Sequence, residues 1–338
     1  MRLVERIWDG GGKGEMLGRA VLFPFETLYR GVVAARGELY DRGVLETRPS
    51  AVPVISVGNL TVGGTGKTPV ASWLAVKLTA MGARPAIVLR GYGEDEILVH
   101  RRLTPGVPVI SSKERSVGIL HAAAAGSNVV VLDDGFQHRQ TSRDADIVIV
   151  SADRWNGRTR LLPAGPWREP FASIGRASLA VISRKAATND QVDEVARAIT
   201  RVAPAIAQTV VALSMSGLTR VGSEMTVVAM SALNGKRLLA VSAVGDPASF
   251  ACQLSLCGAV VASLAFPDHH DFSRADVDDI ITRAGVVEMI VCTLKDAVKL
   301  ESLWPVGAPS LWYVSQSLEV ESGGAAIDEL LNRFRPAN

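Results

Sequence analysis

A glycine-rich turn between a short apolar run and a helical pattern constrains the fold of this chain most strongly. Residues 54–57 form a β-branched run typical of a buried parallel strand. Three glycines follow within residues 63–66, and Lys67, Thr68 and Pro69 come next. We expect Pro69 at the first helical position, where its missing N–H costs nothing. Strand, glycine loop and helix in this order predict a phosphate-binding loop in an α/β fold.

The residue types of this loop suit a bound triphosphate. Glycines let backbone N–H groups turn inward, and the helix start adds partial positive charge. Lys67 would reach the β- and γ-phosphates, and the Thr68 hydroxyl would bind Mg²⁺. The residues expected around the phosphates are Thr61, Val62, Gly63, Gly64, Thr65, Gly66, Lys67 and Thr68. The general pattern favours a small residue where this chain has Thr61, so a plain glycine-rich strand–helix turn is the alternative.

Composition sets broad limits on function. The 338 residues are enough for two domains, each with its own core. A formal net charge of +2 gives no reason to expect a nucleic-acid partner. The three cysteines lack metal-binding spacing, which indicates reduced thiols in a cytosolic protein. No segment reaches the roughly 18 apolar residues of a membrane span, and residues 1–14 lack a signal-peptide core.

Strand and helix patterns alternate along most of the chain, which predicts a parallel sheet with helices on both faces. We expect a nucleotide-binding domain over residues 51–212 and a smaller α/β domain over residues 237–338. An extended linker over residues 213–236 would join them. Residues 1–50 would form an N-terminal segment that contains a helix over residues 23–42.

The expected helix over residues 23–42 is amphipathic, and residues 9–18 before it are expected to be irregular. Its apolar face would contain Phe25, Leu28, Tyr29, Val32, Val33, Leu39 and Tyr40. Its polar face would contain Glu26, Arg30, Glu38 and Asp41, with Arg36 near the apolar stripe. Such a helix could lie in a bilayer interface or pack on the protein's own core. Because the polar face mixes charges of both signs, the pattern alone favours core packing.

Two carboxylates follow the predicted strand over residues 128–132. An apolar strand that ends in acid is what a Walker B element requires. Asp133 or Asp134 would therefore hold Mg²⁺, directly or through water, opposite Thr68. Capping of a strand end is the alternative role for either residue.

Other polar residues could take part in phosphoryl transfer to an alcohol. Asp95, beyond the second predicted strand, could accept the alcohol proton, or it could be a solvated loop carboxylate. The loop over residues 267–272 holds two histidines and two carboxylates. This composition suits a relay to that base better than a metal site, and a plain surface turn is the alternative. Arg168 with Glu169, in a proline-bounded loop, and Lys295 could contact a nucleotide. The alternative for Arg168 and Glu169 is simple solvation, and the alternative for Lys295 is a place at a helix N-terminus capped by Thr293.

Seven motifs occur in an order that resembles one enzyme family. They span residues 57–69, 90–93, 132–138, 162–169, 242–247, 268–269 and 293–300. Together they resemble the tetraacyldisaccharide 4′-kinases, the lipid A 4′-kinases of Gram-negative bacteria. The resemblance runs from about Phe23 to the C-terminal helix. Thr61 is normal for that family, which removes the objection to the phosphate loop.

The resemblance implies a reaction, a location and cofactors. The reaction is ATP- and Mg²⁺-dependent phosphorylation of the 4′-hydroxyl of a tetraacylated glucosamine disaccharide 1-phosphate, a lipid A precursor. The resemblance also implies two α/β domains with the active site in the cleft between them. The N-terminal helix would attach the protein peripherally to the anionic surface of the inner membrane, at its cytoplasmic face. This expectation replaces core packing of that helix.

The resemblance also implies a role for each matching residue. Lys67 and Thr68 match the phosphate and Mg²⁺ positions. Asp133 and Asp134 match the metal and phosphate-side positions. Asp95 matches the family's catalytic base, and His269 matches the histidine paired with it.

The active-site loop of the family matches Arg168 and Glu169, and Lys295 matches the lysine of its Thr-Glu-Lys-Asp motif. Two departures stand out. The insert that usually precedes the Asp-Glu pair is almost absent here, and Glu94 replaces the usual glycine. Leu294 replaces the usual glutamate before Lys295.

Two other functions remain open from the residues. A membrane-cycling ATPase switch of the MinD or ParA kind would share the loop and the amphipathic helix, but it would want a lysine at Val62. It would not need Asp268 and His269. A kinase for a soluble sugar or cofactor is the second alternative. The sequence indicates no oligomeric state.

Overall fold

The computed structural model describes residues 7–8, 10, 12–91 and 93–336. The chain forms two compact units. Unit 1 comprises residues 1–92, 100–213 and 318–338, and unit 2 comprises residues 93–99 and 214–317. The predicted domains were contiguous stretches, whereas the chain passes between these units several times. Residues 1–6, 9 and 11 of the predicted N-terminal segment, Tyr92 of the motif over 90–93, and residues 337–338 lie outside the described residues.

Unit 1 contains a parallel sheet. Its strand order is β7 (Ala207–Arg220), β6 (Leu179–Arg184), β5 (Ala145–Ser151), β1 (Val54–Asn59), β4 (Val129–Asp133), β2 (Pro85–Leu89) and β3 (Val109–Ser111). Each neighbouring pair is parallel. Every residue of β1, β2 and β4 is buried, which explains their continuous apolar sequences. The parallel sheet predicted from the sequence is confirmed.

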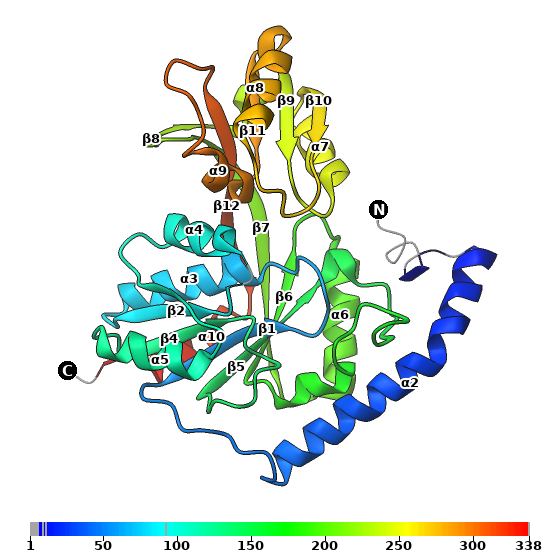
Figure 1. Cartoon of the computed structure of the whole chain (residues 1–338). Helices are drawn as coiled ribbons and strands as arrows, with labels where there is room; N and C mark the ends of the chain where they lie inside the picture. The colour runs from blue at the N-terminus through cyan, green and yellow to red at the C-terminus, as the bar shows by residue number, and fades with distance from the viewer. Residues whose placement is uncertain (1–6, 9, 11, 92, 337–338) are drawn as a thin grey trace. The chain divides into compact units, whose positions relative to one another are not determined.

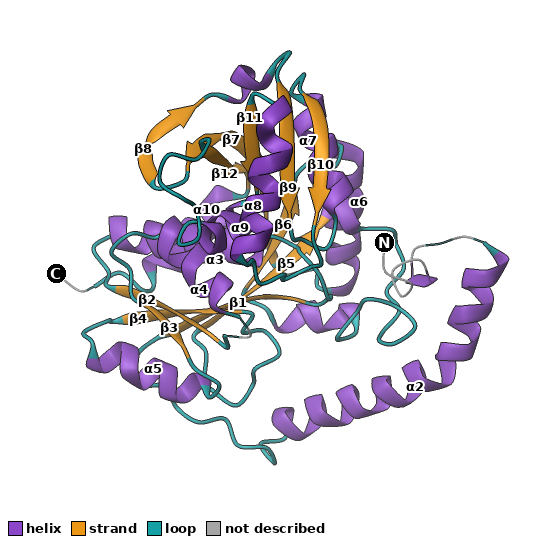
Figure 2. Ribbon diagram, turned by 45° about the horizontal axis from the view of Figure 1, so that its top comes forward, coloured by secondary structure: helices purple, strands orange, loops and turns teal. Residues whose placement is uncertain are grey.

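Helices cover both faces of this sheet, as predicted. They are α3 (Lys67–Ala80), α5 (Arg115–Ala124), α6 (Asn189–Val202) and α10 (Gly324–Asn332), together with the short turns η1 (Ala152–Arg154) and η2 (Phe171–Arg176). Helices α3 and α5 lie on opposite sides of β2 and β4 (Figures 1 and 2). Helix α3 begins at Lys67, so Pro69 is its third residue and not its first. The left-handed Gly66 caps the helix two residues earlier than the proline pattern suggested.

The N-terminal helix α2 spans Lys13–Asp41, ten residues more than predicted at its start (Figure 1). The expectation of irregular structure was therefore wrong for residues 13–18, and Pro24 lies inside the helix. The Arg19 guanidinium donates to the carbonyls of Ile7 (2.6 Å) and Gly10 (2.7 Å). These bonds hold the preceding segment against α2. They compensate for the poor helix propensity of the glycine-rich start of α2. No described helix is both long and apolar enough to span a membrane.

The two faces of α2 differ from the prediction. Glu26, expected on the polar face, is buried and accepts bonds from the Leu161 N–H (3.0 Å) and from Arg160 (3.1 Å). Tyr40 is also buried, and the Tyr29 hydroxyl donates to the Arg168 carbonyl (2.9 Å). Tertiary hydrogen bonds therefore set the inward face. A separate stripe of exposed apolar side chains contains Leu17, Val21, Phe25, Leu28 and Val32.

Unit 2 has its own strands and helices. Its strands are β10 (Val260–Ala265), β9 (Arg237–Ser242), β11 (Met289–Cys292) and β12 (Leu311–Ser322), with β8 (Ser223–Val228) antiparallel to β7. Its helices are α7 (Pro247–Leu256), α8 (Arg274–Arg283) and α9 (Leu294–Leu300), with the turns η3 (Met230–Leu233) and η4 (Ala284–Val286). The β7–β8 hairpin occupies most of the predicted linker over residues 213–236. Strand β12 was not predicted.

Two strands and one helix belong to both units. Strand β7 passes from unit 1 into unit 2 after Leu213, and β12 returns to unit 1 at Leu318. Helix α4 (Glu94–Leu103) begins in unit 2 and continues in unit 1 from His100. The chain therefore passes between the two units at each of these elements. The predicted boundaries at residues 213 and 237 do not include all of these passages.

Candidate active site

The loop between β1 and α3 has the backbone of a phosphate-binding loop. Gly63 (φ +100°) and Gly66 (φ +89°) are left-handed, a conformation that other residues rarely adopt. A Cβ at Gly66 would lie 2.5 Å from Leu213 Cδ1, while the position of a Cβ at Gly64 is open. The loop thus combines a fixed glycine turn with open space at Gly64, while the Arg154 guanidinium lies against Gly63. This arrangement fits a bound phosphate chain.

Neighbouring segments hold this loop in place. The buried Asn59 amide donates to Thr65 Oγ1 (2.8 Å), and Ser183 Oγ donates to the Thr65 carbonyl (2.8 Å). The Val62 N–H donates to the Pro166 carbonyl (2.9 Å). The Thr65 hydroxyl therefore has a structural bond, and the first half of the loop is paired to the motif over residues 162–169.

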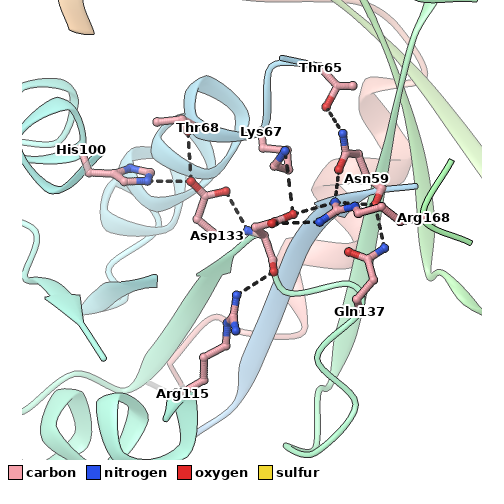
Figure 3. A network of polar contacts seen from close by, with 10 residues as sticks. Asn59, Thr65, Lys67, Thr68, His100, Arg115, Asp133, Gln137 and Arg168 are labelled. Carbon is pink, nitrogen blue, oxygen red and sulfur yellow. Dashed lines mark hydrogen bonds and ion pairs between the residues drawn. The ribbon is translucent and has the colours of Figure 1, made fainter. Parts of the chain in front are cut away.

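Asp133 ends strand β4 and contacts the start of α3 (Figure 3). Its Oδ2 accepts a bond from Thr68 Oγ1 (3.1 Å), and its Oδ1 accepts the Asp134 N–H (2.8 Å). Two of the three predicted magnesium residues, Thr68 and Asp133, are thus in direct contact. Among the described residues no group of three or more His, Cys, Asp or Glu side chains is arranged to hold a metal. A magnesium ion bound through one or two protein oxygens, phosphates and water needs no such group.

Asp134 forms the centre of a cationic cluster. Arg168 donates to both of its carboxylate oxygens (3.1 and 2.9 Å), and Lys67 Nζ lies 3.8 Å from its Oδ1. Arg115 donates to its carbonyl (2.9 Å). Burial by itself would raise the pKa of Asp134, but the bonds from Arg168 and the charge of Lys67 together lower that pKa. The structure therefore joins Lys67, Asp134 and Arg168, as the motifs suggested.

Glu169 has a different partner from its neighbour Arg168. Its carboxylate forms a two-bond ion pair with Arg176 (2.5 and 3.0 Å), and the guanidinium of Arg176 lies 3.9 Å from the centre of the Phe136 ring. The carboxylate is almost fully buried in this pair. A nucleotide contact of Glu169 stays a prediction, and the observed contacts give it a role in holding its own loop.

In unit 2, Asp95 lies in the first turn of α4 and is only 3% exposed, so the alternative of a solvated loop carboxylate is wrong. Its Oδ2 lies 3.2 Å from His269 Nδ1 and 3.5 Å from the ammonium groups of both Lys295 and Lys299. Lys295 Nζ also lies 3.0 Å from His269 Nε2. Because an ammonium group can only donate, Nε2 accepts and Nδ1 carries the hydrogen of the neutral ring. Asp95 Oδ2 has close cationic neighbours but no hydrogen-bond partner among the described residues.

Opposing effects set the charge of Asp95. Burial alone would raise its pKa, but Lys295, Lys299 and His269, with the Glu96 N–H, together lower the pKa below its ordinary value. Asp95 is therefore a carboxylate at neutral pH and can accept a hydrogen bond or a proton. Such a group meets the first requirement of a general base.

The loop over residues 267–272 contributes one residue to this cluster. His269 has a left-handed backbone (φ +62°) and donates its N–H to the Ala243 carbonyl (3.2 Å). His270 instead pairs with Asp276 (3.1 Å) and stacks on Phe266. The position of His269 agrees with the expected relay. The alternative of a helix start near Lys295 is also correct, because Thr293 caps α9.

Three residues of these clusters were missed by the sequence analysis. Asn59 bonds to the loop, Lys299 contacts Asp95, and His100 contacts Asp133 (2.9 Å). Lys299 follows Lys295 by four residues, which places both on one face once α9 is recognised as a helix. His100 had no usable signal, because α4 was not predicted.

Comparisons with known proteins show the family of this chain. The chain matches the family described as tetraacyldisaccharide-1-P 4′-kinase over residues 18–103 and 93–335. The tetraacyldisaccharide 4′-kinase of Anaeromyxobacter sp. (strain Fw109-5) is 38% identical over 89% of this chain and 88% of its own length. The enzyme of the same name from Halorhodospira halophila is 38% identical over 93% of both chains. The crystal structure of LpxK from Aquifex aeolicus in complex with ATP matches with a TM-score of 0.74 and 28% identity, over 94% of this chain and 99% of that one.

Proposed function

Because this chain belongs to the tetraacyldisaccharide-1-P 4′-kinase family, we propose that it transfers a phosphoryl group from ATP to the 4′-hydroxyl of a tetraacyl disaccharide 1-phosphate. The observation that carries the proposal is the contact of Lys67, Asp134 and Arg168 beside a left-handed glycine loop. A glycine loop alone would also suit a nucleotide switch. The buried Asp95–His269 pair gives the chain a candidate proton acceptor, which a kinase needs and a switch does not.

The loop residues bind and orient the triphosphate in this proposal. Backbone N–H groups around Gly63, Gly64 and Gly66 cradle the phosphates, and Lys67 neutralises charge on the transferred group. Arg168 exchanges part of its bond with Asp134 for a phosphate oxygen, because a guanidinium can serve two anions. Thr61 and Val62 keep the first half of the loop paired to its neighbour.

Thr68 and Asp133 would hold magnesium. Their oxygen atoms are hard ligands of the type that Mg²⁺ prefers, and the two side chains already touch. When bound, the ion neutralises charge on the phosphates and orients them for in-line transfer. Asp134, which forms ion pairs with Arg168 and Lys67, supplies negative charge on the same side of the loop.

Asp95 would accept the proton of the 4′-hydroxyl. Its lowered pKa keeps it ionised, and His269 Nδ1 lies 3.2 Å from its Oδ2. The His269 side chain is 53% exposed, so the proton can pass on to solvent. Lys295 fixes the histidine tautomer through Nε2 in this scheme.

A direct assay separates this proposal from its rivals. Purified protein is incubated with γ-labelled ATP, Mg²⁺ and either a tetraacyl disaccharide 1-phosphate in detergent or its fully deacylated form. We expect label in the acylated acceptor at the 4′-oxygen. Label transferred only to the deacylated sugar would support a kinase for soluble substrates. ATP hydrolysis without labelled acceptor would support a membrane-cycling switch.

We propose in addition that α2 attaches the protein to the cytoplasmic face of the inner membrane. Leu17, Val21, Phe25, Leu28 and Val32 fall within an arc of roughly 80° at 100° per residue. Each of these side chains is more than half exposed. The opposite side of α2 is held by Glu26, so the stripe faces away from the protein and suits a lipid interface.

Vesicle flotation tests the attachment. The change Leu28→Glu removes apolar area from the stripe and adds a charge that anionic lipid repels. We expect about tenfold weaker binding to vesicles that contain phosphatidylglycerol. Val286→Glu, at an exposed position in η4, is the matched control and should bind normally. Equal flotation of both variants and the unchanged protein would contradict attachment through α2.

A further inference from the structure

His100 is a fully buried histidine to which the proposed reaction assigns no role. It comes from α4, and its Nε2 lies 2.9 Å from Asp133 Oδ2 (Figure 3). Its Nδ1 lies 2.8 Å from Ser72 Oγ. Ser72 lies on α3, one turn after Thr68, and is also buried. The histidine thus links α3, α4 and the end of β4 through side-chain bonds.

The chemistry of the partners fixes the histidine tautomer. A carboxylate only accepts hydrogen bonds, so Nε2 carries the hydrogen that faces Asp133. In the neutral ring Nδ1 is then the acceptor, and it receives the Ser72 hydroxyl hydrogen. Both ring nitrogens are therefore satisfied without water, and the ring cannot turn without losing a buried bond.

Asp133 is the point at which three donors converge. Its Oδ2 accepts from His100 and from Thr68 Oγ1, and its Oδ1 accepts the Asp134 N–H. A carboxylate with donors on both oxygens has one orientation. Since the hydrogen of Thr68 points at Asp133, the lone pairs of Thr68 Oγ1 are free to face a cation.

We propose that His100 is a positioning residue for the divalent-cation site. It holds the Asp133 carboxylate in the orientation that directs Thr68 Oγ1 toward the ion. The inference rests on the proposed function, because that function assigns Mg²⁺ to Thr68 and Asp133. Partners behind metal-binding residues commonly set ligand orientation and affinity in this way.

Binding of Mn²⁺, followed by electron paramagnetic resonance with ADP present, tests the role. Activity alone would not separate the effects, since Asp95 lies on the same helix as His100. The change His100→Leu removes both ring bonds and should weaken Mn²⁺ binding by about tenfold or more. ADP affinity measured with a chelator present should stay within about twofold, because the glycine loop and Lys67 are unchanged.

Two variants separate positioning from packing. His100→Gln keeps an N–H that can reach Asp133, so it should restore most of the Mn²⁺ affinity. His121→Leu, at an exposed histidine on α5, is the control and should bind Mn²⁺ normally. Should His100→Leu fail to fold, Ser72→Ala takes its place, because loss of the Nδ1 partner frees the ring and should weaken Mn²⁺ binding severalfold.

Three results would overturn the proposal. The first is unchanged Mn²⁺ affinity in folded His100→Leu. The second is that His100→Leu weakens ADP binding, measured with a chelator present, as much as it weakens Mn²⁺ binding. That result would indicate a packing role. The third is His100→Gln binding Mn²⁺ no better than His100→Leu. If the unchanged protein itself binds no Mn²⁺ with ADP, the proposed phosphate loop fails, which is a different result from failure at His100.

Discussion

Asp134 in unit 1 and Asp95 in unit 2 show two ways to keep a carboxylate ionised. Burial opposes the charge of both, and neighbouring cations lower both pKa values. The cations around Asp134, Arg168 and Lys67, belong to segments that would also bind phosphate. The cations around Asp95 are Lys295 and Lys299, which lie one turn apart on α9.

The difference lies in what a ligand would change. Phosphates would compete for Arg168 and Lys67, so the ion pairs of Asp134 are exchangeable. The cations around Asp95, Lys295 and Lys299, lie on α9, outside the phosphate loop. We infer that Asp134 belongs to ligand binding and that Asp95 is kept ready as a base.

Both regions also contain a backbone position that is unusual for its residue type. Asp134 (φ +52°) and His269 (φ +62°) are the non-glycine residues with positive φ in the described part of the chain. Each such conformation costs about 1 kcal/mol, and such costs concentrate at functional sites. The coincidence of strain with the two clusters supports both assignments.

The largest expected effect tests the exchangeable cluster. Lys67→Ala should reduce turnover by about 4 kcal/mol of transition-state stabilisation, roughly 10³-fold, because no other group replaces its charge on the transferred phosphate. Steady-state kinetics with saturating acceptor measure it. Lys77→Ala is the control, since Lys77 lies on the same helix and pairs with Asp328. Equal turnover of Lys67→Ala and Lys77→Ala would contradict a role of Lys67 in stabilising the transition state.

A somewhat smaller effect tests the fixed cluster. Asp95→Asn should lower kcat by about 10²-fold, because the amide cannot accept the hydroxyl proton, while ATP affinity stays the same. Turnover and calorimetric ATP binding are the two measurements. Asp279→Asn, which only disturbs a surface pair with Arg283, should retain full activity. Near-normal turnover of Asp95→Asn would show that the base assignment is wrong.

The smallest expected effect concerns pH. A lowered pKa means that the Asp95 carboxylate stabilises the fold above its unfolded pKa, and this contribution is lost as pH falls through the folded pKa. Lys299→Met removes one cation, so the pKa of Asp95 should rise and the acid side of the kcat profile should move to higher pH. We expect turnover at about pH 4.5 to fall roughly threefold relative to turnover at about pH 8.

The matched control for this change is Lys236→Met, which loses only a surface pair with Glu288. Its pH profile should follow that of the unchanged protein. A Lys299→Met profile identical to both would mean that Lys299 does not set the charge of Asp95, and the two carboxylate clusters would then differ less than their contacts suggest.

Local sequence determined the phosphate loop and its sheet. Apolar strands fully buried on both faces have an unmistakable pattern, and the glycines of residues 63–66 have few other uses. Asp133 and Asp134 could be predicted because the carboxyl ends of parallel strands lie at one edge of the sheet. Helix α9 and its cap also follow from local residues, since Thr293 is a preferred N-cap.

Other features needed contacts between distant residues. Glu26 has the sequence context of a solvated helix position, yet Leu161 and Arg160 bury it. Glu169 is next to Arg168 in sequence but pairs with Arg176. The partners of Glu26 are 134 and 135 residues away in sequence, and Arg176, seven residues from Glu169, is beyond the three- or four-residue spacing of neighbouring side chains on a helix.

By itself the sequence determined that a phosphate loop, a parallel sheet and the motifs of one kinase family occur in this chain, because these depend on short, contiguous patterns. Only the tertiary structure decided which buried polar groups meet: His100 with Asp133, and Asp95 with Lys295 and Lys299. The physical reason is that a buried charge or ring nitrogen must find its partner in space. That partner is set by how helices pack and not by sequence spacing.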